Sequence, residues 1–452
     1  MNRAFIFKVI GIFLLTMVMS WAVMYINSLI SERQNRQNEV KQEIAKSSAG
    51  EQTITGPLLV VPYIEEYAES TTENGIKKTV NVREQHWKFI LPENLELRGG
   101  FTNQFKKLGI YKALTYELGG NFKGTFKLPA HLGISAQRQN STLSIQPAYI
   151  AIGISDPRGI SGQPEFTWNS RTLNFEQGSN VRLLGNGVHV QVGQIENTYE
   201  QNIAFEFKLN LRGMENYNYV PIAENNVINL QSSWQHPHFG GSFLPDPATQ
   251  KISPAGFQAQ WAVSSLSSSN QASLISNLES GERKNELETL NIGFVEPINV
   301  YSQADRATKY GLLFIGLTFA GFFIFEILKQ LRIHPAQYTF VGLAMALFYL
   351  LLISLSEHIS FAAAYFSASL ACVSLLGYYL SYVLKSKANG MLFAVLLTSL
   401  YGALYAILAS EDNALLMGSL LVFGLLAVTM VITRKVDWYQ ISAKESPSFN
   451  NI

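Results

Sequence analysis

Hydrophobic residues gather in long, nearly unbroken runs near both ends of the chain, and the first run covers residues 9–29. About twenty apolar residues are enough for an α-helix to cross the hydrocarbon core of a bilayer. The run follows Arg3 and Lys8 and continues into polar sequence, without the small-residue cleavage site of a signal peptide. The pattern therefore predicts an uncleaved transmembrane anchor over residues 1–30.

The polar sequence that follows the anchor is rich in Gln, Glu and Lys. This composition is typical of a solvated helix that leaves the membrane, and Gly50 is a residue at which such a helix commonly ends. We therefore expect a polar helical stem over residues 31–50.

The middle of the chain has the period-two alternation of β-strands. It is clearest in "AFEFKLNL", residues 204–211, where apolar Phe205, Phe207, Leu209 and Leu211 alternate with polar residues. Such a strand has one buried and one solvated face. The other segments that we expect to form strands are residues 78–91, 113–128, 143–155, 166–175, 188–192, 227–234, 257–263 and 290–295.

Many short strands without intervening helical periods favour antiparallel pairing. The sequence thus predicts a large, mainly-β antiparallel domain over residues 51–305, which the pattern allows to be one domain or two subdomains. The stretch 265–288 is rich in Ser, Asn and Glu and is expected to form a loop or a solvated helix.

The last third of the chain returns to apolar runs that are each long enough to span a bilayer. The five runs are residues 310–328, 338–355, 359–384, 391–409 and 414–433. They predict a five-helix transmembrane bundle over residues 306–434, followed by a tail at 435–452. The expected fold is a membrane protein with six transmembrane α-helices and one large β-rich domain.

Basic residues in short loops collect on the cytoplasmic side of a membrane. Four basic segments fall on one predicted side, at Arg3 and Lys8, residues 329–334, residues 385–387 and residues 434–435. The orientation predicted from them places both termini in the cytoplasm and residues 31–305 on the opposite side.

The overall composition excludes some classes of protein. The 452 residues carry a net charge of +1, which does not suggest nucleic acid or another strongly charged partner. The single cysteine, Cys372, cannot form an intrachain disulfide, so the middle region must fold on its hydrophobic core.

Two histidines are the metal-site candidates. In "WQHPHF", His236 and His238 would lie on one face of a strand and could supply two zinc ligands, with His189 as a third. Two ligands do not make a site, and we interpret the segment as a Pro-containing strand end or turn. No nucleophile-elbow, H-E-x-x-H or P-loop motif is present, so we expect no cofactor and no enzyme of a common class.

Ionisable residues also occur within the apolar third. Residues 338–384 would form a helix of about 70 Å, more than twice the bilayer core, so the chain must turn near Glu357 and His358. We expect this pair at a hairpin tip on the outer membrane face; the alternative is a buried relay. Glu326 lies within one turn of Lys329, and we expect the two to reach the cytoplasmic interface together.

Several distinctive segments occur along the chain. The longest are "DRATKYGLLFIGLTFAGFFIFEILKQLRIHPAQY" and "VGLAMALFYLLLISLSEH", and shorter ones are "GPLLVVPY", "LGIY", "SDPRGI", "WQHPHFGGSFLP", "GFQAQW" and "VDWYQ". Together these segments resemble the CreD family of inner-membrane proteins. The resemblance implies a Gram-negative inner-membrane protein with a periplasmic domain and a role in cell envelope integrity. It also implies links to a two-component stress response, colicin tolerance and β-lactam susceptibility, but no catalytic residues.

The expected function is therefore envelope maintenance and stress response, through periplasmic binding of a lipid, a cell-wall component or a protein partner. One alternative is a transporter or lipid-handling protein, although the apolar helices offer few polar residues at mid-bilayer depth. A second is a membrane-anchored enzyme of an unrecognised class. The sequence leaves the oligomeric state open.

Overall fold

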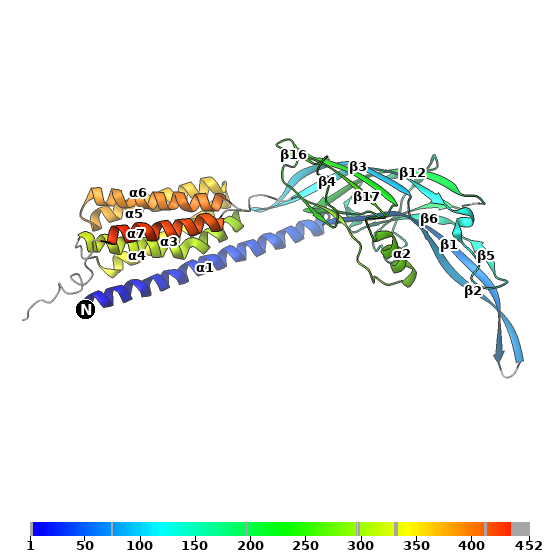
Figure 1. Cartoon of the computed structure of the whole chain (residues 1–452), viewed down its shortest axis with the longest axis horizontal. Coiled ribbons are helices and arrows are strands. Elements are labelled where there is room, and N and C mark those ends of the chain that lie inside the picture. Colours follow the sequence, from blue (N-terminus) through cyan, green and yellow to red (C-terminus); the bar gives the residue numbers. More distant parts are fainter. Residues whose placement is uncertain are drawn as a thin grey trace, which may run out of the picture. The chain divides into compact units, whose positions relative to one another are not determined.

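The computed structural model describes residues 3–434, except 74–75, 196–197, 295, 297–298, 330–332 and 411–413. The chain divides into two compact units. The helical unit comprises residues 1–38 and 298–452, and the β unit comprises residues 39–297. Helix α1 is continuous and contributes residues to both (Figure 1).

The helical unit contains apolar helices at all six predicted positions. Their bounds are α1 (Arg3–Ser47), α3 (Val300–Lys329), α4 (Pro335–Ser356), α5 (Phe361–Val383), α6 (Lys387–Ala409) and α7 (Ala414–Thr433). In the described part of the chain, five of them are long and apolar enough to cross a membrane, and α7 adds a shorter apolar stretch, Leu416–Val431. The predicted fold class is confirmed, and α1 carries the predicted polar stem without a break.

Local capping explains where the short helix connections fall. His334 caps α4 in a capping box with Gln337, and Pro335 occupies the first helical turn. The hydroxyls of Ser360 and Ser386 accept hydrogen bonds from backbone N–H groups in the first turns of α5 and α6. These polar residues end each apolar run and let the chain reverse within a few residues.

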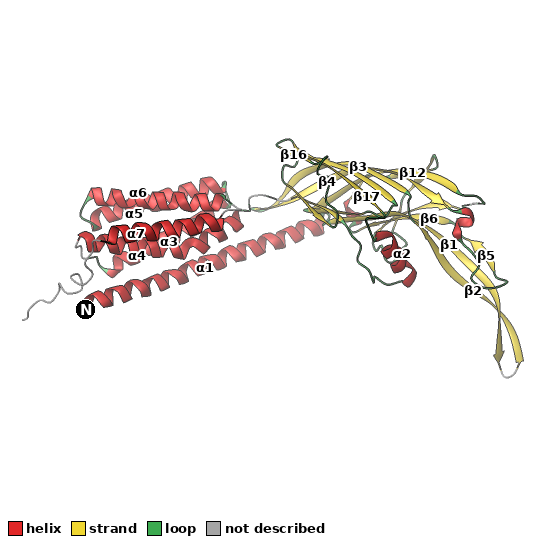
Figure 2. Ribbon diagram, in the orientation of Figure 1, coloured by secondary structure: helices red, strands yellow, loops and turns green. Residues whose placement is uncertain are grey.

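The β unit is built from two nine-stranded sheets. The first contains β1 (Gln52–Glu73), β2 (Ile76–Ile90), β5 (Thr142–Ile145), β6 (Ala148–Ile154), β10 (Glu176–Gln177), β11 (Gly187–Gly193), β13 (Asn216–Val220), β15 (Pro237–Gly241) and β18 (Leu290–Phe294). The second contains β3 (Asn94–Leu108), β4 (Tyr111–Leu128), β7 (Ile160–Ser161), β8 (Glu165–Trp168), β9 (Arg171–Asn174), β12 (Gln201–Met214), β14 (Asn225–Ser232), β16 (Lys251–Ser253) and β17 (Gly256–Ser264). Figure 2 shows the strands gathered in this unit.

The two sheets share one hydrophobic core, so the β unit is a single sandwich domain. Phe101 of β3 contacts Tyr217 of β13 and Phe294 of β18, with ring centroids 5.2 Å and 5.0 Å apart. The alternating residues predicted for β12 point into this core, and Leu211 is fully buried. Period-two patterning therefore identified the buried face of this strand correctly.

The predicted antiparallel pairing holds for most strands of the domain, with two exceptions. Most pairs are antiparallel, but β1 pairs with β13 and β3 pairs with β14 in parallel register. Side-chain alternation sets which face of a strand is buried but not the direction of its neighbour, so these long-range pairings left no sequence signal. The predicted loop or solvated helix at 265–288 includes α2 (Asn270–Ser280), whose Leu274 and Leu278 pack against the first sheet.

Candidate functional site

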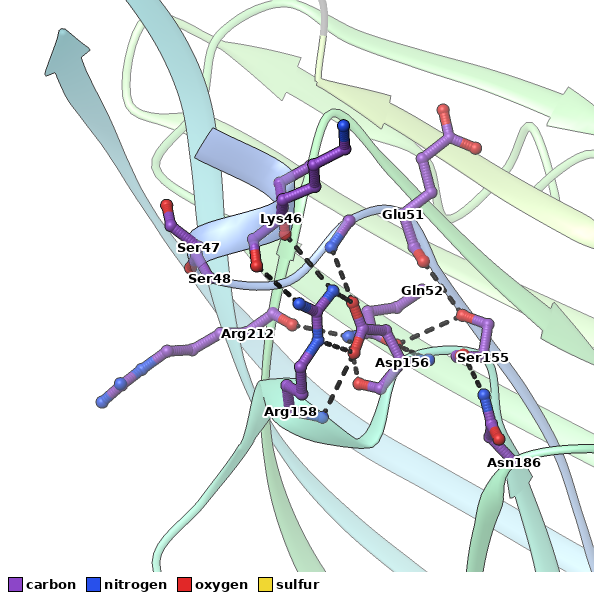
Figure 3. A network of polar contacts seen from close by, with 12 residues as sticks. Lys46, Ser47, Ser48, Glu51, Gln52, Ser155, Asp156, Arg158, Asn186 and Arg212 are labelled. Atoms are coloured by element: carbon purple, nitrogen blue, oxygen red, sulfur yellow. Dashed lines mark hydrogen bonds and ion pairs between the residues drawn. The ribbon is translucent and has the colours of Figure 1, made fainter. Parts of the chain in front are cut away.

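The C-terminal end of α1 is held by an arginine from the β unit. The guanidinium of Arg158 donates hydrogen bonds to the carbonyl oxygens of Lys46, at 2.5 Å, and Ala45, at 3.4 Å (Figure 3). These carbonyls have no partner further along the helix, and a cation beside them is stabilised by the negative end of the helix dipole. Arg158 belongs to the "SDPRGI" segment, in the short 3-10 helix Pro157–Gly159.

Asp156 fixes the guanidinium in this position. Its carboxylate accepts two hydrogen bonds from the Arg158 guanidinium, at 2.8 and 2.6 Å, and others from the backbone N–H groups of Arg158, at 3.3 Å, and Gly50, at 3.2 Å. The paired hydrogen bonds have the bidentate geometry that makes arginine–carboxylate pairs strong. The hydrogen bond from Arg158 is also the main reason that the pKa of Asp156 lies below its ordinary value.

A buried amide completes the junction beneath the ion pair. The side chain of Gln52 is fully buried, and its Nε2 donates to the backbone oxygens of Asp156, at 2.9 Å, and Arg212, at 2.8 Å. Gly159 packs so closely that an added Cβ would collide with the Arg212 carbonyl. We call residues Lys46, Gln52, Asp156 and Arg158 the α1 junction (Figure 3).

The low pKa of Asp156 makes the α1 junction sensitive to acid. Because the folded pKa is lower than the unfolded value of about 4, the carboxylate stabilises the fold above pH 4 and loses this effect as pH falls through the folded pKa. We expect Asp156→Asn to cost about 1.5–3 kcal/mol at pH 7, typical of hydrogen bonds to a charged group, and much less at pH 3. Tryptophan fluorescence during thermal unfolding reports this, since four of the six tryptophans lie in the β unit. An equal cost at both pH values would contradict the assignment.

An open groove of about 670 Å³ adjoins the α1 junction. Arg158 lines it together with Gln163, Asn174, Glu176 and Gln177. The volume lies in the range of small-molecule sites, and the lining offers side-chain amides and both signs of charge. A molecule in this groove would therefore contact the same arginine that caps α1.

The opposite end of α1 forms a buried ion pair with α3. The carboxylate of Glu326 is 4% exposed and pairs with the ammonium of Lys8. It also accepts hydrogen bonds at 2.9 Å from the backbone N–H of Ile333 and the hydroxyl of Tyr338. Glu326 does not extend to the surface beside Lys329 as expected, because Lys329 is exposed whereas Glu326 is buried and pairs with a residue 318 positions away in the sequence.

The Glu357–His358 segment forms the turn between α4 and α5, as predicted. Glu357 is not a free side chain, however. Its Oε1 accepts a hydrogen bond from the Tyr301 hydroxyl at 3.2 Å and lies 3.7 Å from Nε of Arg33 on α1. His358 is exposed. The carboxylate thus joins α1, α3 and the α4–α5 turn.

Between these two ion pairs, α1 packs on glycines of neighbouring helices. Met19 lies against Gly342 of α4, and Val23 lies against Gly311 of α3. Asn27 accepts a hydrogen bond from the Thr308 hydroxyl at 2.9 Å. Small residues let helices approach closely inside membranes, so these two glycines leave room for the side chains of Met19 and Val23.

The three histidines considered as metal ligands do not form a site. Both ring nitrogens of the buried His189 have neighbours of their own, the Gly178 carbonyl at 2.7 Å and the Asn180 side chain at 3.0 Å. His236 precedes β15 and His238 lies within it, and both are exposed. No cluster of three metal-binding side chains occurs among the residues that the structure describes.

Sequence reasoning did not single out Arg158, Asp156, Lys8 or Arg33 as candidate functional residues. "SDPRGI" stood out only as a segment with a family resemblance, and its Asp-x-Arg spacing is the one local sign of the ion pair. Lys8 and Arg33 were interpreted as flanking charge and polar stem. Their partners are remote in sequence, and only folding brings them together.

The sequence matches known proteins over nearly its whole length. A family model described as "Inner membrane protein CreD" matches residues 4–439. The inner membrane protein CreD of Escherichia coli (strain K12) is 34% identical over 435 residues, covering 96% of this chain and 94% of that protein. A crystal structure of a candidate nutrient binding protein from Legionella pneumophila covers 49% of this chain and 79% of its own, with 10% identity and a TM-score of 0.24. Similarity at that level supports no inference.

Proposed function

The chain belongs to the CreD family of inner membrane proteins, and on that premise we propose that it maintains cell envelope integrity, and responds to envelope stress, by binding in the periplasm. The bound molecule would be a lipid, a cell-wall component or a protein partner. The proposal places the β unit in the periplasm and both termini in the cytoplasm, as the basic loops predict. Its mechanism is binding without turnover.

The observation that supports this proposal is the double role of Arg158. Arg158 lines the 670 Å³ groove, and its guanidinium donates to the last carbonyls of α1. A bound molecule that draws Arg158 toward the groove would weaken its hydrogen bonds to α1. A ligand can shift the equilibrium between two conformations only by the difference between its binding free energies for them.

The ion pairs of α1 supply a route for such a change. Residues of α1 reach Glu326 through Lys8 and the α4–α5 turn through Arg33. Since α1 is one unbroken helix, a change at its C-terminal cap acts on the element that carries these pairs. Binding of a molecule to the β unit would in this way alter the contacts of α1 with the membrane helices.

Complementation of a deletion strain tests the proposal. We expect Arg158→Gln to fail to restore resistance to detergent and β-lactams, because it removes both the helix cap and the groove cation. Arg98→Gln is the matched control, since Arg98 is an exposed arginine that pairs only with Glu96, its neighbour on the same strand, among the described residues. Immunoblots must show equal amounts of both proteins. Full complementation by Arg158→Gln, or a deletion strain with normal resistance, would reject the proposal.

Lipid handling is a second candidate function, favoured by an apolar groove of about 470 Å³ between α5 and α6. Three hydroxyls in its lining already donate to backbone carbonyls: Tyr365 of α5 to Tyr401 of α6, and Ser369 and Thr398 each to a carbonyl of its own helix. The groove therefore offers mainly apolar surface, which suits an acyl chain. If lipid handling were the function, Arg158→Gln would complement as well as Arg98→Gln.

A further inference from the structure

The turn that joins β3 to β4 exposes apolar side chains beside basic ones. Phe105, Leu108 and Ile110 are 41%, 46% and 46% exposed. Gly109 makes the turn with a φ of +63°, a conformation that residues with a Cβ rarely adopt. We call residues 105–112 the hairpin tip. Exposed apolar side chains that cluster at one turn indicate a surface that contacts another molecule or a membrane.

Basic side chains surround these apolar groups. The ammonium of Lys107 forms no hydrogen bond or ion pair with any residue that the structure describes, and its side chain is exposed. Among the described residues, Lys106 donates only to the neutral hydroxyl of Ser48, at 2.8 Å, so no carboxylate there offsets its charge. Lys112 is neutralised by Glu296. The hairpin tip therefore presents two uncompensated positive charges next to Leu108 and Ile110.

The hairpin tip lies where the chain enters and leaves the β unit. Ser48, the partner of Lys106, directly follows the last residue of α1. Glu296, the partner of Lys112, precedes the first residue of α3 by four positions. Both α1 and α3 are long and apolar enough to cross a membrane. The two connections to membrane helices thus leave from beside this hairpin.

We propose that the hairpin tip is a membrane-contact element that inserts Leu108 and Ile110 into the adjacent leaflet of the bilayer. Lys106 and Lys107 would bind the phosphates of anionic lipids, as basic residues beside interfacial apolar groups do. A protein partner fits less well, because a stable protein interface buries about 800 Å² on each side, far more than one turn provides. The proposal is independent of the Arg158 groove and holds for either orientation of the β unit.

Site-specific fluorescence in lipid nanodiscs tests this contact on the full-length chain. Cys372 is the single native cysteine and is replaced by serine, after which Leu108→Cys is labelled with an environment-sensitive nitrobenzoxadiazole dye. Leu266→Cys is the matched control, since Leu266 is a leucine of the β unit with 98% exposure. In nanodiscs of phosphatidylglycerol and phosphatidylcholine, doxyl-labelled lipids should quench the dye at position 108 at least twofold. Aqueous iodide should quench position 266 instead.

The role of the lysines is tested in the same system. Lys106→Gln together with Lys107→Gln should at least halve the lipid quenching at position 108, and so should nanodiscs of phosphatidylcholine alone. Iodide quenching at position 108 equal to that at 266, without doxyl quenching, would overturn the proposal. A blue shift at 108 that doxyl lipids do not quench would also overturn it, because the dye would then be covered by protein. Lipid quenching independent of charge would overturn the role assigned to the lysines.

Discussion

Lys8→Met is expected to destabilise the helical unit by about 3 kcal/mol, because it leaves the carboxylate of Glu326 buried without a cation. Breaking a buried ion pair from one side typically costs 3–5 kcal/mol. We expect the lower end of that range, since Glu326 keeps its hydrogen bonds from Ile333 and Tyr338. Unfolding of the purified protein in increasing mole fractions of sodium dodecyl sulfate, followed by circular dichroism, measures the loss.

Replacing Glu326 instead of Lys8 distinguishes the cost of an unpaired buried charge from the cost of a lost contact. In Glu326→Gln the remaining ion is Lys8, whose side chain is 28% exposed and keeps a hydrogen bond to the Ile333 carbonyl at 3.2 Å. It should cost clearly less than Lys8→Met, and the double variant should recover most of the stability lost in Lys8→Met. Additive losses in the double variant would show that the two residues contribute separately.

Gly342→Ile is expected to separate α1 from α4 at the centre of their contact. A Cβ on Gly342 would lie 2.8 Å from Sδ of Met19 and 2.8 Å from the ring of Phe319, and a branched side chain leaves no space for either. Overpacking of this kind typically costs about 1–3 kcal/mol. Its structural effect is measured by crosslinking Asn27→Cys to Thr308→Cys in a Cys372→Ser background, since the two native side chains are hydrogen-bonded.

A neighbouring glycine provides the control for this experiment. Gly321 of α3 is exposed, and apart from its chain neighbours and its own helix backbone no described residue has an atom within 4 Å of a Cβ placed there. Gly321→Ile should crosslink as efficiently as the parent, whereas Gly342→Ile should reduce the crosslink several-fold. Equal crosslinking in both would mean that α1 does not depend on the Met19–Gly342 contact for its position.

The positions of the membrane helices could be predicted because their signal is local. An apolar run must be long enough to cross a bilayer, and polar residues such as His334 and Ser360 both interrupt the run and cap the next helix. Helix α3 begins ten residues before the predicted apolar run 310–328, because residues 300–309 are helical but polar. Hydropathy detects the apolar part of a helix, and α3 extends beyond it.

The candidate site was only partly predictable. The turn at Glu357 followed from helix length alone, but its contacts with Arg33 and Tyr301 come from two other helices. Glu326 was recognised as unusual, yet it was assigned the nearest lysine in sequence. A charged residue in an apolar run indicates that a partner is required. The identity of that partner depends on which helix packs against the run.

The sequence by itself determined the six apolar helices, the β-rich domain between them and the buried face of β12, because each depends on the spacing of apolar residues over one element. The tertiary structure alone decided the parallel pairing of β1 with β13, the hydrogen bonds by which Arg158 caps α1, and the ion pair between Lys8 and Glu326. These contacts join residues more than 100 positions apart. No periodic pattern encodes them, since they form only when separate elements pack together.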